Sequence, residues 1–204
     1  MQMSFEEAKK QFSERFKDHK ATLLMNTDRY AAIDFRNENG SSCYYVNFLI
    51  DKLTGMLVVS GDLGTCVAQW FNKVNLIEMK SLVSESPDYF ASKFQCASDQ
   101  YYYDPEQIFN ALVEFYGRDE LADVDKVYEG DTDNSIFDDL KCAVEYSITC
   151  GDTVFSPSSR LIYLWQDVLG CDLYDLYGFP EKLIDTRVYL WMIAFEKACT
   201  QLGF

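Results

Sequence analysis

Histidine chemistry in this chain depends on a single residue, because the sequence contains one histidine, His19, in 204 residues. A Ser-His-Asp or Cys-His catalytic site would have to use His19, and no nucleophile-elbow sequence accompanies it. Metal sites built on two histidines are excluded. His19 lies near the end of the first expected helix, where positive charge is favoured. We therefore interpret it as a surface or capping residue.

The segment Gly61-Asp62-Leu63-Gly64 holds the best single candidate for carboxylate chemistry. It superficially resembles a phosphate-binding loop, but it lacks the lysine and the glycine spacing of a P-loop or a dinucleotide fingerprint. The simpler interpretation is a sharp bend after a strand, with the glycines at positive φ and Asp62 bonded to nearby backbone amides. An enzyme that uses carboxylates, centred on Asp62, is the alternative.

The acidic run Asp131-Thr132-Asp133-Asn134-Ser135 resembles the start of a calcium loop. The match fails at its sixth position, where Ile136 replaces the required glycine, and at its twelfth, where Cys142 replaces the bidentate glutamate. Acids that complement the dipole of a helix N-terminus explain the run better. A metal site made of carboxylates alone stays open because acids are plentiful, but we expect neither a metal site nor a cofactor.

The cysteines predict a reducing compartment. Their number is seven, their spacings are wide and irregular, and no C-x-x-C pair occurs, unlike a disulfide framework or a zinc ribbon. The first ten residues do not have the pattern of a signal peptide. No apolar run approaches the roughly 18–20 residues that cross a bilayer. We expect a soluble cytoplasmic protein that does not bind membranes.

Acidic residues are concentrated in the middle of the chain. The formal net charge is -15, and residues 97–154 carry 15 acids against 3 bases. Residues 1–96 carry 12 against 11, and residues 155–204 carry 6 against 4. A negative face repels nucleic acid and attracts basic surfaces. We therefore expect a basic partner protein and no direct binding of nucleic acid, although acidity for solubility alone is the plainer explanation.

The candidate partner-binding residues follow from this charge. Tyrosines close to the acids in sequence can act as rigid aromatic anchors, which interfaces favour, or can equally be core residues at a helix start. The acids are Asp119, Glu120, Asp123, Asp125, Glu129, Asp131, Asp133, Asp138 and Asp139, and the tyrosines are Tyr101, Tyr103 and Tyr128.

The elements that must position these residues begin with a helix and an antiparallel sheet. Ser4 and Glu7 form a capping box, and apolar residues follow at helical spacing. Aromatic and β-branched runs separated by turn residues then indicate hairpins. The expected strands of this meander are residues 30–35, 43–50 and 56–60, with 22–25 as a fourth option.

The C-terminal half is expected to be predominantly helical. Asp104-Pro105, Ser135 and Ser156-Pro157 are typical helix starts, and residues 185–202 form a long final helix ended by Gly203. A helix, a meander and then helices make the α+β class. We expect a single domain, residues 1–204, with an optional subdivision into residues 1–96 and an acidic helical part, residues 97–204.

The segment from Ser60 through Gly61, Asp62 and Gly64 to Trp70 resembles a pattern in uncharacterised bacteriophage and prophage proteins. In those proteins an apolar strand is followed by Gly-Asp-aromatic or leucine-Gly and then by a tryptophan. The stretch from Asp88 to Cys96, Asp-Tyr-Phe-Ala-Ser-Lys-Phe-Gln-Cys, is similar to the second piece of the pattern. The four motif residues, Gly61, Asp62, Gly64 and Trp70, have either a structural or a binding role.

The resemblance implies an accessory protein of a mobile element that acts in the cytoplasm of a bacterial host. Small acidic phage proteins without catalytic residues often inhibit host defence nucleases, as many anti-CRISPR proteins do. Duplex DNA presents about one negative charge per 1.7 Å, and proteins that bind it line their channels with Lys and Arg. We expect a non-enzymatic inhibitor that mimics nucleic acid and binds a CRISPR-type effector nuclease. A phage structural or assembly accessory protein is a further alternative, and the oligomeric state stays open.

Overall fold

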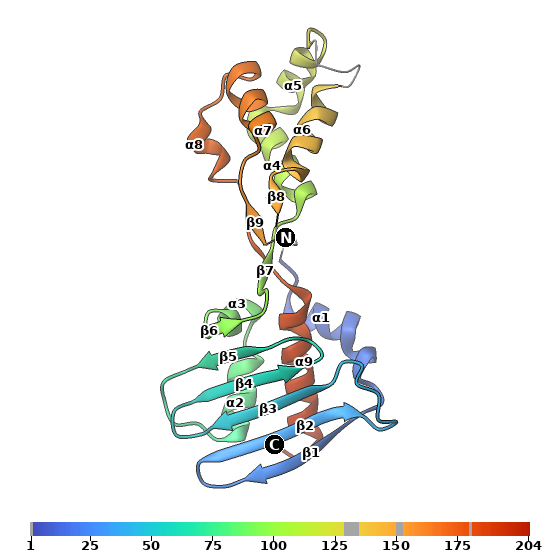
Figure 1. The fold of residues 1–204 in the computed structure, drawn as a ribbon, viewed down its shortest axis with the longest axis vertical. Coiled ribbons are helices and arrows are strands. Elements are labelled where there is room, and N and C mark those ends of the chain that lie inside the picture. Colours follow the sequence, from blue (N-terminus) through green and yellow to red (C-terminus); the bar gives the residue numbers. More distant parts are fainter. Residues whose placement is uncertain (1, 129–134, 150–152, 180) are drawn as a thin grey trace. The chain divides into compact units, whose positions relative to one another are not determined.

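The computed structural model describes residues 2–128, 135–149, 153–179 and 181–204 (Figure 1). The chain forms two compact units. The sheet unit consists of Met1–Gln100 and Ile184–Phe204, and the acidic unit consists of Tyr101–Leu183. The predicted α+β class is confirmed, with an N-terminal helix, an antiparallel meander and helices in the C-terminal half.

The sheet unit begins with the predicted helix, α1 (Phe5–Phe12), which continues into a 3₁₀ turn, η1 (Ser13–Phe16). Its capping box is present, because the Ser4 hydroxyl accepts from the Glu7 N–H and the Glu7 carboxylate accepts from the Ser4 N–H. The residues at helical spacing are all buried: Phe5, Ala8, Phe12 and Phe16.

The sheet has six strands, each hydrogen-bonded to the next along the chain in an antiparallel meander. Three correspond to the predicted strands, and the optional fourth is longer than expected. The last two were not predicted, because each has only four residues, too few for a hydrophobic alternation to stand out. The strands are β1 (His19–Asn26), β2 (Tyr30–Asn37), β3 (Val46–Asp51), β4 (Met56–Gly61), β5 (Cys66–Gln69) and β6 (Phe94–Ala97).

Helices cover one face of this sheet. The final helix, α9 (Thr186–Gln201), packs on β1, β2 and β3 and also contacts α1, α2 (Leu76–Val83) and α3 (Pro87–Ala91). Figure 1 shows α9 running across the strands. The optional subdivision into residues 1–96 and 97–204 grouped α9 with the acidic part, whereas the two compact units divide after Gln100 and include α9 in the sheet unit. Helix α9, from the C-terminal part of the sequence, thus completes the core of the sheet unit.

The acidic unit has a hydrophobic core of its own, formed around residues such as Leu112, Leu140 and Trp165. Asp104 and Ser135 cap helices as predicted, whereas the third helix begins after Ser158 rather than at Ser156. The elements are β7 (Tyr101–Tyr102), α4 (Pro105–Tyr116), α5 (Arg118–Asp125), α6 (Ile136–Glu145), β8 (Ile148–Thr149), β9 (Val154–Phe155), α7 (Ser159–Tyr163), the π-helical turn η2 (Leu164–Val168) and α8 (Leu173–Leu176). The short strand β10 (Leu183–Ile184) spans the end of this unit and the return of the chain to the sheet unit.

Candidate functional site

The charge asymmetry of the sequence coincides with the division into units. The acidic unit contains 18 Asp and Glu against 5 Lys and Arg, so it carries a net charge of -13. The sheet unit contains 15 against 13, which leaves -2. Nearly all of the excess charge therefore belongs to one folded module of 83 residues.

Helix α5 brings three of the predicted acids together. Asp119, Glu120 and Asp123 are exposed, and their spacing of one and four residues puts them on one side of the helix. The opposite side is anchored by Leu121, which is fully buried. Lys126 is the neighbouring cation, with its Nζ 2.6 Å from an Asp123 oxygen. We call Asp119, Glu120 and Asp123 the α5 stripe.

Two further acids form hydrogen bonds at the start of α6. The Asp125 carboxylate accepts from the Ile136 N–H at 2.7 Å, and the Asp138 carboxylate accepts from the Ser135 hydroxyl at 2.8 Å. Asp138 is exposed, whereas Asp125 is half-buried. The predicted residues Glu129, Asp131 and Asp133 lie outside the described residues.

The ninth acid, Asp139, is bound inside the unit. Its Oδ2 accepts from the Tyr128 hydroxyl at 2.6 Å and from Arg160 Nη2 at 2.6 Å. Arg160 Nη2 also donates to the Tyr128 oxygen at 3.0 Å, and the Asp139 side chain is only 10% exposed. Burial, and then the bond to Asp139, raise the pKa of Tyr128 to about 12. Tyr128 and Asp139 were expected at a partner surface, but their polar groups hold α6 and α7 together.

The predicted aromatic anchors are half-buried. The Tyr103 ring packs against Phe155, with 5.9 Å between centroids, and Tyr101 lies in β7. Other tyrosines of the unit are more exposed, with Tyr174 reaching 86%. Proximity to acids in sequence therefore did not select the most exposed rings of the unit. The exposed tyrosines are Tyr146, Tyr163, Tyr174 and Tyr177.

The segment around Asp62 forms the bend that its glycines predicted. Gly61 has φ +142° and Gly64 has φ +88°. The Asp62 carboxylate accepts from the Tyr44 N–H at 2.8 Å, and the Asp62 N–H donates to the Tyr45 carbonyl at 2.9 Å. The carboxylate thus stabilises the loop that leads into β3, where Tyr44 itself has φ +55°.

The two motif segments, residues 60–70 and 88–96, meet within the sheet unit. The Trp70 ring stacks on Phe90 at 6.2 Å, and Phe90 meets Phe94 edge to face at 4.8 Å. Phe94 in turn lies 5.9 Å from Trp191 of α9. The pattern residues Trp70, Phe90 and Phe94 therefore have a packing role, which accounts for their types without a ligand.

His19 is a core residue rather than a surface or capping residue, so that interpretation is wrong. The first helical segment ends at Phe16, and His19 begins β1 with 5% of its surface exposed. Its ring lies 5.2 Å from both Phe16 and Phe35, and its Nε2 is 3.2 Å from the Cys43 carbonyl oxygen. Burial lowers its pKa below the ordinary value.

The described part of the chain has no arranged metal ligands, no disulfide and no membrane-spanning helix. Within residues 2–128, 135–149, 153–179 and 181–204, no group of three His, Cys, Asp or Glu side chains is arranged to hold a metal ion. The six cysteines in those ranges are unpaired thiols. Across the same residues, no helix has both the length and the apolar content of a membrane span.

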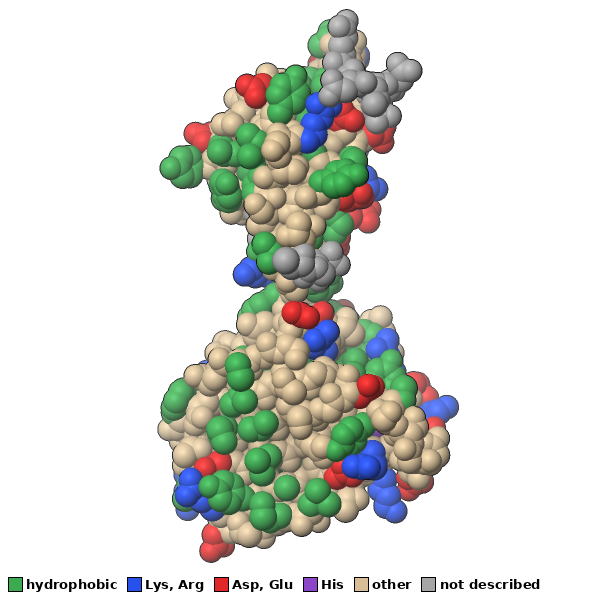
Figure 2. Space-filling view, viewed as in Figure 1, with side chains coloured by type: hydrophobic (Ala, Val, Ile, Leu, Met, Phe, Trp, Pro, Cys, Tyr) green, Lys and Arg blue, Asp and Glu red, His purple; other side chains and the backbone are tan. Residues whose placement is uncertain are grey.

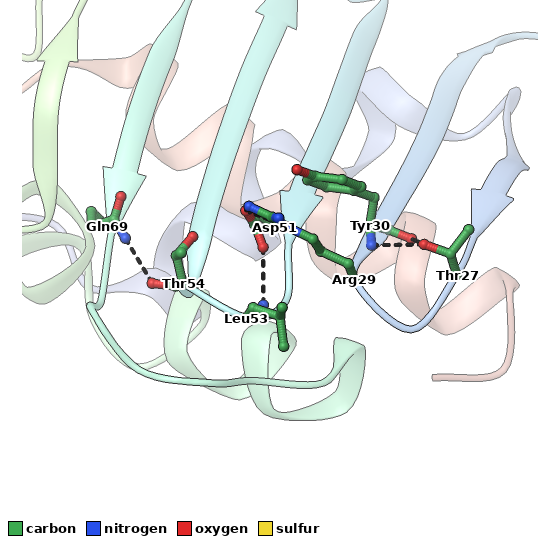
Figure 3. Close-up of polar contacts among 7 residues, drawn as sticks. All are labelled: Thr27, Arg29, Tyr30, Asp51, Leu53, Thr54 and Gln69. Atoms are coloured by element: carbon green, nitrogen blue, oxygen red, sulfur yellow. Dashed lines mark hydrogen bonds and ion pairs between the residues drawn. The ribbon is translucent and has the colours of Figure 1, made fainter.

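The uncovered face of the sheet contains a feature that sequence reasoning missed. Arg29 Nη2 lies 3.0 Å from an Asp51 oxygen, and the Asp51 carboxylate also accepts from the Leu53 N–H at 3.0 Å (Figure 3). Arg36 and Asp34 form a second pair at 2.5 Å. Each guanidinium also lies over a tyrosine ring. Arg29 lies over the adjacent Tyr30, and Arg36 lies over Tyr45 in the loop before β3.

No protein-family model, curated protein or solved structure matches this chain. The resemblance to phage proteins stays a prediction from the motif residues.

Proposed function

We propose that this protein is a non-enzymatic binding protein whose acidic unit engages the basic, nucleic-acid-handling surface of a bacterial protein. The observation that carries the proposal is the confinement of a net charge of -13 to one module with its own core. Summed charge of one sign on a folded surface accelerates encounter with a surface of opposite sign and disfavours other partners.

The α5 stripe supports nucleic-acid mimicry by its linear charge density. Helix α5 has eight residues and, at about 1.5 Å per residue, is about 12 Å long. One strand of duplex DNA places a charge about every 3.4 Å along its axis, or three to four over that length. The stripe presents three carboxylates on one helix side. The α5 stripe thus presents to a channel lined with Lys and Arg a density of negative charge similar to that of one DNA strand.

Exposed aromatic rings give this surface the means to hold a complex once it has formed. Tyr174 and Tyr177 lie at α8, three residues apart, and both are exposed. Tyrosine is enriched among residues that dominate binding energy, because a large rigid ring loses little entropy on burial. We assign the anchoring role to these rings in place of Tyr101, Tyr103 and Tyr128.

The partner class follows from the phage resemblance. The target is a defence nuclease of the CRISPR effector type in the cytoplasm of a bacterial host, and the protein inhibits it by excluding its nucleic acid. Asp62 has no part in this function beyond stabilising its bend.

The test is capture of the nuclease from bacterial lysate on immobilised protein. We expect one stoichiometric nucleic-acid-handling protein, released by duplex DNA and by raising salt from about 50 to about 200 mM, because both compete for ionic contacts. The combined substitution Asp119→Asn, Glu120→Gln and Asp123→Asn should reduce capture at least tenfold. The matched control neutralises three exposed acids of the sheet unit, Glu14, Asp28 and Glu85.

Two outcomes would overturn the proposal. One is undiminished capture by the α5 variant, and the other is equal loss in the sheet-unit control. Both variants are checked by circular dichroism, so that loss of folding is not mistaken for loss of binding.

A further inference from the structure

A groove opens between the first and the last helix of the sheet unit. Helix α1 contacts α9, and beside that contact lies a cavity of about 310 Å³, which we call the α1–α9 groove. Phe16 and Ile193 form its floor, each with 1% of its surface exposed. Ligand sites range from about 300 to 1,000 Å³, so this volume suits a small molecule. The lining residues are Lys9, Ser13, Phe16, Lys17, Ile193, Glu196, Lys197, Thr200 and Gln201.

Helical spacing puts the polar side chains of this groove on two facing walls. Lys9, Ser13 and Lys17 follow one another at four-residue intervals from α1 to the end of η1. On α9, Glu196 and Thr200 have the same spacing. Residues four apart lie on the same side of a helix. Each wall is therefore a row of polar groups on a regular helical segment, above a floor that is part of the core.

The groove is basic in a chain whose net charge is -15, because three lysines and one acid line it. Lys9 is occupied, since its Nζ lies 2.6 Å from a Glu6 oxygen and 3.4 Å from a Glu196 oxygen. The side chains of Lys17 and Lys197 form no ion pair with any residue that the structure describes. Elsewhere on the sheet unit, Figure 2 shows Lys and Arg side chains beside Asp and Glu. The groove thus keeps two ammonium groups available.

We propose that the α1–α9 groove binds a small phosphorylated sugar, either free or as part of a nucleotide. A phosphate monoester has a charge of about -1.5 to -2 at neutral pH, which two ammonium groups balance. Lysine is a common phosphate ligand because its ammonium group is a compact charge with three donors. The Ser13 hydroxyl, on the same wall as Lys17, supplies a further donor to the phosphate oxygens.

The opposite wall suits the hydroxyl groups of the sugar. The Thr200 hydroxyl donates to the Glu196 carbonyl at 2.7 Å, so its oxygen is left to accept a hydrogen bond. The Glu196 carboxylate has two oxygens, of which Oε1 faces Lys9, and it accepts hydrogen bonds only. Acceptors on one side and ammonium groups on the other distinguish a phosphorylated sugar from a simple anion.

NMR titration of the full chain with ribose phosphate tests the proposal. His19 is the one histidine of the sequence, and its ring lies 5.2 Å from that of Phe16 in the floor, so its signal reports on the groove. We expect saturable shifts of the His19 ring and the Thr200 methyl with a sub-millimolar dissociation constant. The Ile77 methyl on α2 should not move. Inorganic phosphate should bind more weakly, and ribose should not bind.

Charge-matched variants separate the groove from general attraction of an anion. Lys17→Gln combined with Lys197→Gln should weaken binding at least tenfold, because a hydrogen bond to a charged group changes an equilibrium by about that factor. The control combines Lys10→Gln and Lys73→Gln, which remove the same charge from exposed lysines outside the groove. Its affinity should stay within twofold of the wild type. Circular dichroism verifies that both variants are folded.

Several results would overturn the proposal. These are the absence of saturable shifts up to about 10 mM ribose phosphate, equal binding of ribose, and equal losses in the two double variants. Inorganic phosphate that binds as tightly as ribose phosphate would overturn the contact with the sugar. Adenosine monophosphate distinguishes the two sources, since tighter binding than ribose phosphate assigns the groove to a nucleotide and equal or weaker binding to a free sugar phosphate. The groove belongs to the sheet unit, so this proposal and nuclease binding can fail separately.

Discussion

The side chain of Gln201, in the last turn of α9, accepts a hydrogen bond from the Ala21 N–H of β1 at 2.8 Å. The same amide donates to the His19 carbonyl at 2.9 Å. Strand β1 is an edge of the sheet, and edge strands expose backbone groups that can pair with another chain. One glutamine therefore satisfies a donor and an acceptor that a neighbouring strand would otherwise use.

Gln201→Ala should lower the free energy of unfolding by about 1–3 kcal/mol, because it leaves the Ala21 N–H without a partner. The measurement is urea unfolding followed by circular dichroism. Hydrogen exchange adds a local readout, since the Ala21 amide should lose protection. Gln95→Ala in β6, an exposed glutamine, is the control and should change stability by less than about 0.5 kcal/mol. An unchanged Ala21 exchange rate would contradict the assignment.

Asp139→Asn should destabilise the acidic unit by about 1–3 kcal/mol, because the charge-assisted bonds to Tyr128 and Arg160 are lost. Hydrogen exchange of α6 amides locates the effect, which should spare the sheet unit. Asp123→Asn, whose carboxylate is exposed beside Lys126, is the matched control and should cost less than about 1 kcal/mol. Equal losses of stability in the two variants would show that the contacts of Asp139 with Tyr128 and Arg160 contribute no more than the exposed Asp123–Lys126 pair.

The raised pKa of Tyr128, about 12, predicts a pH dependence in the alkaline range. An unfolded tyrosine ionises near 10, so the stabilisation is complete below that pH and is lost as pH rises toward about 12. Wild type should lose more stability than Tyr128→Phe between about pH 10 and about pH 12. Identical alkaline unfolding curves for the two proteins would refute this assignment.

Local signals in the sequence predicted the starts of α1, α4, α6 and α9, whereas α2, α3, α5 and α8 were not predicted. Ser4, Asp104 and Ser135 cap helices through contacts within three residues, so the sequence window around each contains the whole interaction. The concentration of acids in the middle of the chain was also evident from counting the charged residues of the sequence. Strands β5 and β6 were missed because their formation depends on pairing with β4 and with each other rather than on their own four-residue patterns.

Some features depend on contacts between residues far apart in the sequence, and local patterns could not predict them. His19 is buried because β1 pairs with β2 and brings Phe35 against its ring. Asp139 is bound by Arg160, twenty-one residues later, so its carboxylate is not available as counting alone implied. The outward-facing apolar residues of the sheet are equally invisible in sequence, because they come from six strands and become neighbours only through the register: Met25, Ala32, Leu49, Val58, Val67 and Cys96.

The Arg29–Asp51 pair predicts a pH dependence in the acidic range. The hydrogen bond from Arg29 lowers the pKa of Asp51 below its ordinary value of 3.8. The pair therefore stabilises the fold above that pH, and its contribution is lost as pH falls through the lowered pKa. In a carboxyl NMR titration, Arg29→Ala should move the Asp51 pKa up toward 3.8. Lys52→Ala, a neighbouring cation that bonds to Asn26, is the control and should leave it in place. No movement in the Arg29 variant would contradict the pairing.

The bend at Gly61 gives a test that separates backbone geometry from side-chain chemistry. A Cβ at Gly61 would lie 2.2 Å from the Tyr45 carbonyl oxygen, and the residue has φ +142°. Gly61→Ala should therefore cost about 2–4 kcal/mol, since both strain and a backbone clash must be relieved. Gly40→Ala is the matched control, because Gly40 has φ +80° but no atom within 4 Å of the added Cβ, and it should cost about 1 kcal/mol. Urea unfolding of both variants gives the comparison. Equal losses would mean that the added Cβ does not clash with the Tyr45 carbonyl oxygen, and that glycine is needed at position 61 only for its positive φ angle.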